Sequence, residues 1–261
     1  MAIAITERHS YFGNYFNTNS SPTFTPAAGS VLIVVGYHGS PPANISLTGF
    51  GSWSEIYSYP DSREFKIFAL AVGDSPTADS ITFNSNSGNQ KGSFWVGEIT
   101  GADGSSNTSA FAQVNSADYY QSSLSTNTYS ANLNSFASSE NATLVIANIS
   151  KNASSGSSMA VEAGYTAYGS PDYTNIGFLD DEDLSPSFDV TSSFDTAVIT
   201  GLEIVAAGSG GGGGGGNTGP SIDNIDGDNE VSAGQQNVVI TGTNIENATS
   251  ATLGGAALTI V

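Results

Sequence analysis

The sequence contains no cysteine and very few basic residues. The absence of cysteine excludes disulfide bonds, thiolate zinc sites and cysteine nucleophiles. Only 5 Lys and Arg residues stand against 24 Asp and Glu residues, which gives a formal net charge of −19, and the last base along the chain is Lys151. Proteins bind nucleic acids and anionic lipids through Lys and Arg side chains. We therefore expect neither nucleic acid nor a membrane among the partners.

Long apolar segments are also missing. No stretch approaches the roughly 18 consecutive apolar residues that a membrane-spanning helix requires. Residues 1–8 lack the basic stretch and following apolar run of a secretory signal. In a chain with the features of an extracellular protein, this combination favours release by cell lysis as part of a virus particle. We therefore expect the protein on the virion surface.

Helical periodicity is nearly absent, and short β-branched or aromatic runs are separated by Gly, Asn, Ser, Asp and Pro. This pattern predicts many short strands joined by turns, and hence an all-β fold with two packed sheets. The clearest runs cover residues 30–37, 44–48, 53–59, 64–72, 80–84, 93–100, 142–150, 174–179 and 196–206. We expect residues 1–207 to form one large, jelly-roll-like antiparallel β-sandwich.

The side-chain pattern distinguishes two kinds of strand. Residues 31–35 and 144–149 are almost entirely apolar, which is typical of strands covered on both faces, and we expect them at the centre of the sandwich. Residues 53–59 alternate instead, which places Trp53 and Tyr57 on one face. Such alternation predicts an outer or edge strand.

Two further segments have an unusual composition. Residues 105–158 are rich in Asn and Ser, whose side chains satisfy the backbone of turns, so we expect loops that decorate the sandwich there. Residues 208–219 include seven consecutive glycines at 210–216. A glycine run has no side chains to bury and a high entropic cost of ordering, so it predicts a flexible tether between residues 1–207 and residues 220–261.

The segment after the tether carries a recognisable pattern. It opens with Pro-Ser-Ile-Asp-Asn-Ile at 220–225, continues with an apolar run that contains Gly242-Thr243-Asn244, and reaches two glycines at 254–255. This pattern resembles the opening half of an IPT/TIG domain, which is an immunoglobulin-like β-sandwich. The resemblance implies a partial Ig-like domain over residues 220–261, with the rest of the domain beyond Val261.

Residues 25–205 resemble a second family in their layout. The segments that carry the resemblance are PAAGSVLIVVGY, the Gly-Phe-Gly-Ser-Trp-Ser segment at 49–54, FWVGEITGADG and ATLVIANIS. They are similar to jelly-roll-like modules of bacteriophage fibre, tail and head-decoration proteins and of bacterial surface proteins. The resemblance implies partner proteins in a capsid or tail and a homo-oligomer, and it brings no catalytic residues with it.

Two groups of residues are candidate binding sites. Asp180, Asp181 and Asp183 belong to a run of four acids, which repel one another unless a cation or water screens them, so they form a candidate Ca²⁺ site. A solvated loop is the alternative, and we expect no other cofactor. Tyr119 and Tyr120 lie in polar surroundings and form a candidate platform for a glycan or a neighbouring subunit. Core packing is the alternative for these rings.

The sequence favours a structural protein over an enzyme. No Gly-x-Ser-x-Gly turn accompanies the two histidines, and nothing identifies a catalytic pair of carboxylates. We expect a non-enzymatic structural virion protein of a tailed bacteriophage, displayed as a fibre or decoration and aiding adhesion to host surface glycans. The alternative is a secreted bacterial adhesin or a carbohydrate-binding or carbohydrate-active protein.

Overall fold

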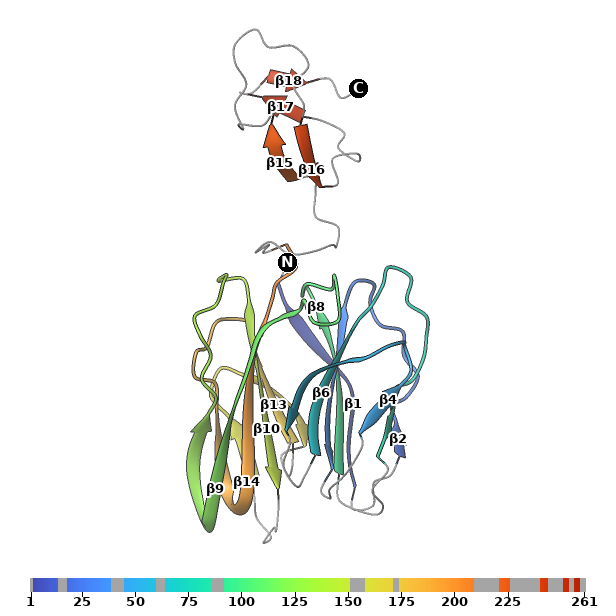
Figure 1. Cartoon of the computed structure of the whole chain (residues 1–261). Coiled ribbons are helices and arrows are strands. Elements are labelled where there is room, and N and C mark those ends of the chain that lie inside the picture. The colour runs from blue at the N-terminus through green and yellow to red at the C-terminus, as the bar shows by residue number, and fades with distance from the viewer. Residues whose placement is uncertain are drawn as a thin grey trace. The chain divides into compact units, whose positions relative to one another are not determined.

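The protein is all-β, as the sequence predicts. The computed structural model describes residues 2–13, 18–38, 45–59, 64–85, 92–150, 158–170, 174–208, 221–225, 240–243, 251–253 and 256–258. These residues form antiparallel strands and turns and contain no helix (Figure 1). Among them there is accordingly no apolar helix of the length needed to cross a bilayer. The chain divides into two compact units, Met1–Gly213 and Gly214–Val261.

The first part of the larger unit forms a five-stranded sheet and a three-stranded sheet. The five-stranded sheet has the order β1 (Ala4–Gly13), β8 (Gly92–Thr100), β3 (Val31–His38), β6 (Glu64–Ala71) and β5 (Ser54–Tyr59). The three-stranded sheet has the order β2 (Thr18–Ser20), β7 (Thr82–Asn84) and β4 (Ser46–Thr48). In Figure 1 the strands β2 and β4 lie on the right of the five-stranded sheet.

The second part of the larger unit is built around one long strand. It contains β9 (Phe111–Ser130), β10 (Ala142–Ser150), β11 (Ser158–Val161), β12 (Thr166–Ser170), β13 (Thr174–Leu179) and the long strand β14 (Ser187–Ile204). On one side, β14 pairs with β9 along its whole length. On the other side, the start of β14 pairs with β11 and its end pairs with β10, which continues to β13 and β12.

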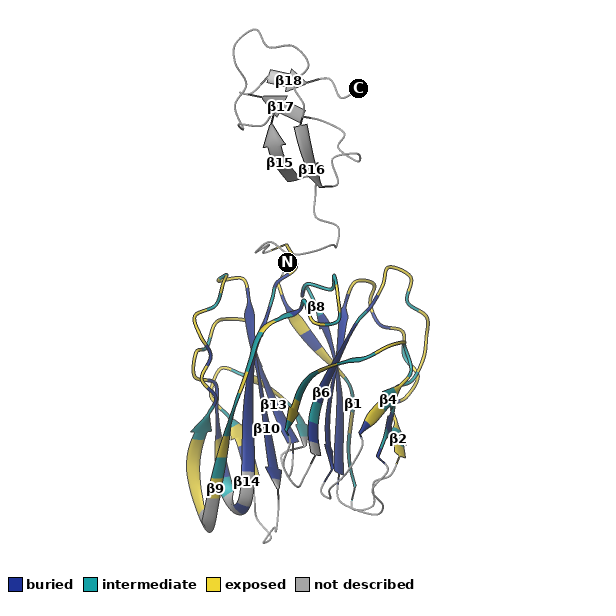
Figure 2. Ribbon diagram, in the orientation of Figure 1, coloured by how far each residue is buried: buried dark blue, intermediate teal, exposed yellow. Residues whose placement is uncertain are grey.

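Three apolar clusters hold these layers together. The first lies between the two large sheets and includes Ile33 and Trp95 from one sheet and Leu144 from the other. The second lies between the first large sheet and the β2-β7-β4 sheet, and the third lies on the outer face of the second large sheet. The central strands β3 and β10 therefore bury both faces, as predicted, and Figure 2 shows the contrast between buried β10 and exposed parts of β9.

All nine predicted strands are confirmed, and two other expectations are wrong. Residues 111–130 within the expected loops form β9, which pairs with β14 and packs a few apolar and aromatic side chains against the first and third clusters. The strand β5 is an edge strand as predicted, but its register shifts between Glu55 and Tyr57. This bulge places Trp53 against the second cluster and Tyr57 against the first, so the two rings do not share a face.

The described residues of the smaller unit form two strand pairs. The strand β15 (Ser221–Ile225) pairs antiparallel with β16 (Ile240–Thr243), and β17 (Ala251–Leu253) pairs antiparallel with β18 (Ala256–Leu258). These strands include the apolar segments on which the IPT/TIG resemblance rests. Membership of that family stays a prediction, and residues 209–219 of the predicted tether at 208–219 lie outside the described residues.

Candidate functional site

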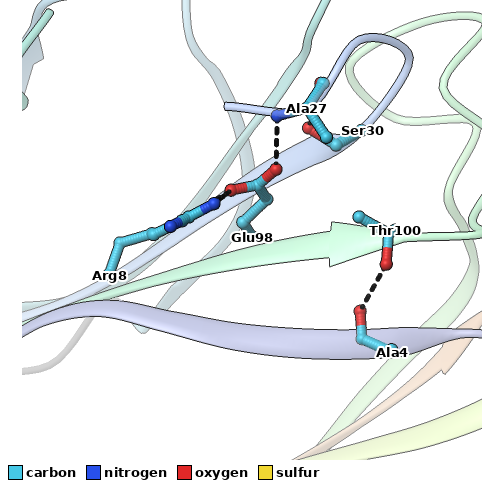
Figure 3. Close-up of polar contacts among 6 residues, drawn as sticks. All are labelled: Ala4, Arg8, Ala27, Ser30, Glu98 and Thr100. Atoms are coloured by element: carbon cyan, nitrogen blue, oxygen red, sulfur yellow. Dashed lines mark hydrogen bonds and ion pairs between the residues drawn. The ribbon is translucent and has the colours of Figure 1, made fainter. Parts of the chain in front are cut away.

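A buried carboxylate lies at the end of β8. The side chain of Glu98 is 1% exposed, and it accepts hydrogen bonds at 2.6 Å from the backbone N–H of Ala27 and at 2.6 Å from Nε of Arg8. Figure 3 shows these two donors reaching the carboxylate from different directions. The second guanidinium contact is an ion pair from Nη2 of Arg8. Glu98 thus joins β8, β1 and the segment that leads into β3.

The paired Arg8 side chain lies beside two aromatic rings at the surface. The Arg8 side chain remains 31% exposed, and its Cζ lies 5.4 Å from the centroid of the Phe24 ring. The Phe24 and Phe50 rings are in turn 4.9 Å apart, and both residues are half-buried. We call Arg8, Phe24 and Phe50 the aromatic row. The polar edge of the guanidinium is occupied by Glu98, so the row offers mainly apolar and π surfaces to a ligand.

The backbone at Phe50 has an unusual conformation. Its φ is +59°, and the neighbouring residues Gly49 and Gly51 also have positive φ, at 101° and 138°. For a residue with a side chain this conformation costs about 1–2 kcal/mol. Two contacts hold it: the Phe50 N–H donates to Oδ2 of Asp79 at 3.0 Å, and the Trp53 indole N–H donates to the Gly49 carbonyl at 2.9 Å. Strained positions of this kind cluster at functional sites, which makes the row the candidate binding surface.

Asp79 gives the loop at Phe50 a predictable response to acid. The N–H groups of Phe50 and Ser80 hold the pKa of the Asp79 carboxyl below its ordinary value of 3.8. The stability that this carboxylate contributes is therefore present above pH 3.8 and is lost as the pH falls through the lower, folded-state pKa. We expect Asp79→Asn to remove this part of the acid dependence, which thermal melts of both proteins from pH 2 to pH 6 will measure. An unchanged difference between the two proteins across this range would contradict the assignment.

The carboxylates of the predicted acidic cluster accept hydrogen bonds from their own loop and from residues elsewhere in the chain. Asp181 Oδ1 accepts the N–H of Glu182 at 2.8 Å. Asp183 accepts the N–H of Ser185 at 2.8 Å and the hydroxyl of Tyr165 at 2.7 Å. Burial raises the pKa of the Tyr165 phenol, and the hydrogen bond to Asp183 raises it further, so this phenol remains a donor. These are the contacts of a capped turn.

The described part of the chain contains no group of three or more His, Asp or Glu side chains that could hold a metal ion. Asp180 is exposed at the start of the same loop. Calcium binding by Asp180, Asp181 and Asp183 stays a prediction.

The two predicted tyrosines lie in different environments. Tyr119 is half-buried against the third cluster, its ring is 4.5 Å from that of Tyr129, and its hydroxyl donates to the Ser130 carbonyl. Tyr120, the next residue on β9, is 68% exposed. Successive residues of a strand point to opposite faces, so the pair does not form one platform. Tyr120 alone presents its ring to solvent.

Sequence reasoning missed the aromatic row because its members are far apart in the chain. Phe24 lies 16 residues after Arg8, and Phe50 lies 26 residues after Phe24. Glu98, the ion-pair partner of Arg8, is 90 residues away and reaches it through the pairing of β1 with β8. One local signal was available, namely the isolated Phe50 between Gly49 and Gly51. Glycines on both sides of an aromatic residue indicate a tight turn that presents the ring.

Comparison with known proteins gives no relative: no family model, no curated protein and no solved structure matches this chain.

Proposed function

We propose that this protein is a non-enzymatic structural component of a tailed bacteriophage particle, displayed on the surface as a fibre or decoration protein. The sandwich contacts neighbouring capsid or tail proteins as a homo-oligomer, and surface rings contact host glycans. The proposal rests on the lack of cysteine, the low content of basic residues and the resemblance of residues 25–205 to phage surface modules.

The observation that supports a structural role most directly is how the strand carboxylates are used. Glu98 is paired with Arg8, Glu7 accepts the Trp95 indole N–H at 2.7 Å, and Glu203 is 2% exposed and bonded to Gln113 at 2.7 Å. Glycoside hydrolysis needs one carboxyl group as an acid and a second as a base or nucleophile. These three carboxylates instead form hydrogen bonds that join neighbouring segments of the sandwich.

The aromatic row is the proposed contact for host glycans. The apolar faces of sugar rings pack on aromatic rings, and each such contact is weak on its own. Weak contacts suffice when many copies are displayed together, since multivalency raises avidity by about 10²–10⁴. The net charge of −19 keeps such copies soluble.

The location is tested on purified particles. Particles from a lysed producing culture are separated on a density gradient, and each fraction is analysed by mass spectrometry. The proposal expects peptides of this chain in the particle band, at a constant ratio to the major capsid protein. Peptides found only in the envelope fraction or the particle-free supernatant would favour the secreted bacterial adhesin or carbohydrate-active protein.

Phe50→Gly separates binding from stability. Glycine adopts a positive φ without strain, and this gain offsets the removal of the ring that packs on Phe24, so we expect the free energy of unfolding to change by less than about 1 kcal/mol. Binding of the labelled protein to cells of the producing host is expected to fall by up to about tenfold, because each site then has one aromatic ring fewer for the sugar. Leu184→Ala, at an exposed apolar side chain outside both candidate glycan contacts, is the matched surface control. Equal binding by wild type and Phe50→Gly would remove the aromatic row from the proposal.

A further inference from the structure

We infer that the sandwich consists of two copies of one unit of eight strand segments, which pack on each other through their large sheets as the subunits of a homodimer do. The first repeat contains β1–β8 and the second contains β9–β14. The inner face of each repeat is thus an interaction surface whose partner is a second copy of the same unit. This inference is independent of the proposed function.

The first evidence is the order of the strands in the two large sheets. The first repeat has the order β1-β8-β3-β6-β5. In the second repeat β9 pairs with β14, and the path continues through β10 and β13 to β12. In each sheet the first strand of the repeat pairs with the last strand: β1 with β8, and β9 with β14. The last strand pairs on its other side with a central strand, β3 or β10, and the central strand pairs with the second strand of a hairpin, β5-β6 or β12-β13. All of these pairs are antiparallel.

The outer layer is repeated as well. In the first repeat, β7 lies between β2 and β4 on the outer face of the large sheet. In the second, residues 187–191 of β14 lie between the end of β9 and β11, and they contribute to the third cluster on the outer face. Each repeat thus has eight strand segments in two layers, which is the composition of a jelly roll. The second repeat differs in that β9 and β14 each run unbroken from one layer to the other.

A backbone hydrogen bond recurs beside each outer layer. In the first repeat, the N–H of Ser21 donates to the carbonyl of Ile81 at 2.9 Å. In the second, the N–H of Ala131 donates to the carbonyl of Pro186 at 3.1 Å. Ser21 directly follows β2 and Ala131 directly follows β9, while Ile81 and Pro186 directly precede β7 and β14. The same donor and acceptor positions are therefore used in both repeats.

The buried glutamates occupy equivalent positions. Glu98 is followed by Ile99 near the end of β8, and Glu203 is followed by Ile204 at the end of β14. Glu203 accepts hydrogen bonds from Nε2 of Gln113 at 2.7 Å, from the N–H of Ala137 at 3.2 Å and from Nδ2 of Asn141 at 2.5 Å. In each repeat, then, one carboxylate accepts a side-chain donor from the first strand and a backbone N–H from the segment that leads into the next central strand.

The contacts between the repeats are reciprocal. Tyr57 on β5 donates its hydroxyl to Ser116 on β9 at 2.7 Å, and Tyr168 on β12 donates its hydroxyl to the carbonyl of Ile5 on β1 at 3.1 Å. The strands β5 and β12 are equivalent, as are β1 and β9. Burial raises the pKa of both phenols. Each repeat therefore contacts the other with the same edge strand.

The ends of the last strands also meet reciprocally. Residues Ala102 and Ala206, which follow β8 and β14, form an antiparallel bridge. The N–H of Asp103 donates to the carbonyl of Val205 at 2.9 Å, and the N–H of Ala207 donates to the carbonyl of Gly101 at 2.7 Å. An interface in which each surface makes the same contacts to the other is the isologous interface of a two-fold dimer.

The sequence retains only traces of this repeat. Tyr57-Ser-Tyr-Pro-Asp in the first repeat corresponds to Tyr168-Gly-Ser-Pro-Asp in the second, and Phe83 corresponds to Phe188. The two copies have diverged beside the glutamate. Gln113 lies opposite Glu203, as Thr6 lies opposite Glu98, and it exchanges hydrogen bonds of 2.8 and 2.9 Å with the backbone of Asn134. In the first repeat the side-chain donor comes instead from Arg8, beside the bulge in β1. The second repeat therefore lacks the arginine of the aromatic row.

An experimental structure of the full chain tests the inference. Residues 4–102 and 111–207 are expected to superpose strand for strand, with Glu98 on Glu203 and Tyr57 on Tyr168. A best superposition that pairs the strands in another order, or that separates the two glutamates, would overturn it.

Matched variants of the full chain test the reciprocal interface in solution. Tyr57→Phe and Tyr168→Phe each remove one hydrogen bond between the repeats, so each is expected to lower the Tm by about 2–4 °C. Tyr120→Phe, at an exposed position, is expected to leave the Tm unchanged. A decrease in Tm in only one of the two matched variants would contradict equivalent contacts.

Discussion

Replacing Glu98 by alanine is expected to lower the free energy of unfolding by about 3–5 kcal/mol, which is the range for breaking a buried ion pair by removal of one partner. The carboxylate is 1% exposed, and its removal leaves both the Arg8 guanidinium and the Ala27 N–H without their acceptor. Urea denaturation of the two proteins measures the difference, provided that the dependence on denaturant is unchanged.

The double variant Arg8→Met/Glu98→Met distinguishes pair formation from a general intolerance of the site. Apolar residues of similar volume commonly replace a buried ion pair at little cost. We expect the double variant to recover most of the stability that Glu98→Ala loses. A double variant as unstable as Glu98→Ala would show that the pair itself does not account for the effect.

The second large effect is expected at two phenylalanines in equivalent positions. Phe83 and Phe188 are each 0% exposed, the first in the cluster on the outer face of the first repeat and the second in the corresponding cluster of the second repeat. Truncation of a buried Phe to Ala costs about 3–5 kcal/mol. We expect Phe83→Ala and Phe188→Ala to fall in this range and to resemble each other, as measured by denaturant unfolding.

Tyr120→Ala provides the control for these truncations. Its ring is 68% exposed, so its removal is expected to change the free energy of unfolding by less than about 0.5 kcal/mol. A small effect at Phe83 with a large effect at Phe188, or the reverse, would contradict equal roles for the two outer layers.

The sequence predicted those strands whose apolar side chains show where they lie. The strands β3 and β10 are apolar on both faces and are central, while the alternating β5 is an edge strand. The strand β9 was missed because most of its side chains are Ser, Thr, Asn and Tyr, and its pairing with β14 is not visible in the sequence. A polar strand paired on one side has the composition of a loop.

The repeat was not visible in the sequence for a related reason. A jelly-roll unit requires apolar residues at the buried positions of each strand, and many combinations of Val, Ile, Leu and Phe satisfy that requirement. The first repeat places Val31, Ile33 and Val35 on the inner face of β3, whereas the second places Ala142, Leu144 and Ile146 on β10. The two repeats therefore share the pairing of their strands but not the identity of their residues.

The candidate binding sites were predicted less well than the fold. Runs of acids and adjacent tyrosines are visible in the sequence, but their contacts depend on residues elsewhere in the chain. Asp183 accepts a hydrogen bond from the hydroxyl of Tyr165. The Tyr119 ring packs against Tyr129, and its hydroxyl donates to the Ser130 carbonyl. The aromatic row depends on the approach of Phe24 to Phe50, which no spacing along the chain indicates.

The central claim, that the protein is displayed on a phage particle, is tested most directly by immunogold electron microscopy of particles and cells from a producing culture. An antibody raised against the full chain is expected to label heads or tails at regular positions, which also separates a decoration from a fibre. Gold confined to cell envelopes, with bare particles in the same field, would contradict the claim and favour the secreted adhesin or carbohydrate-active protein.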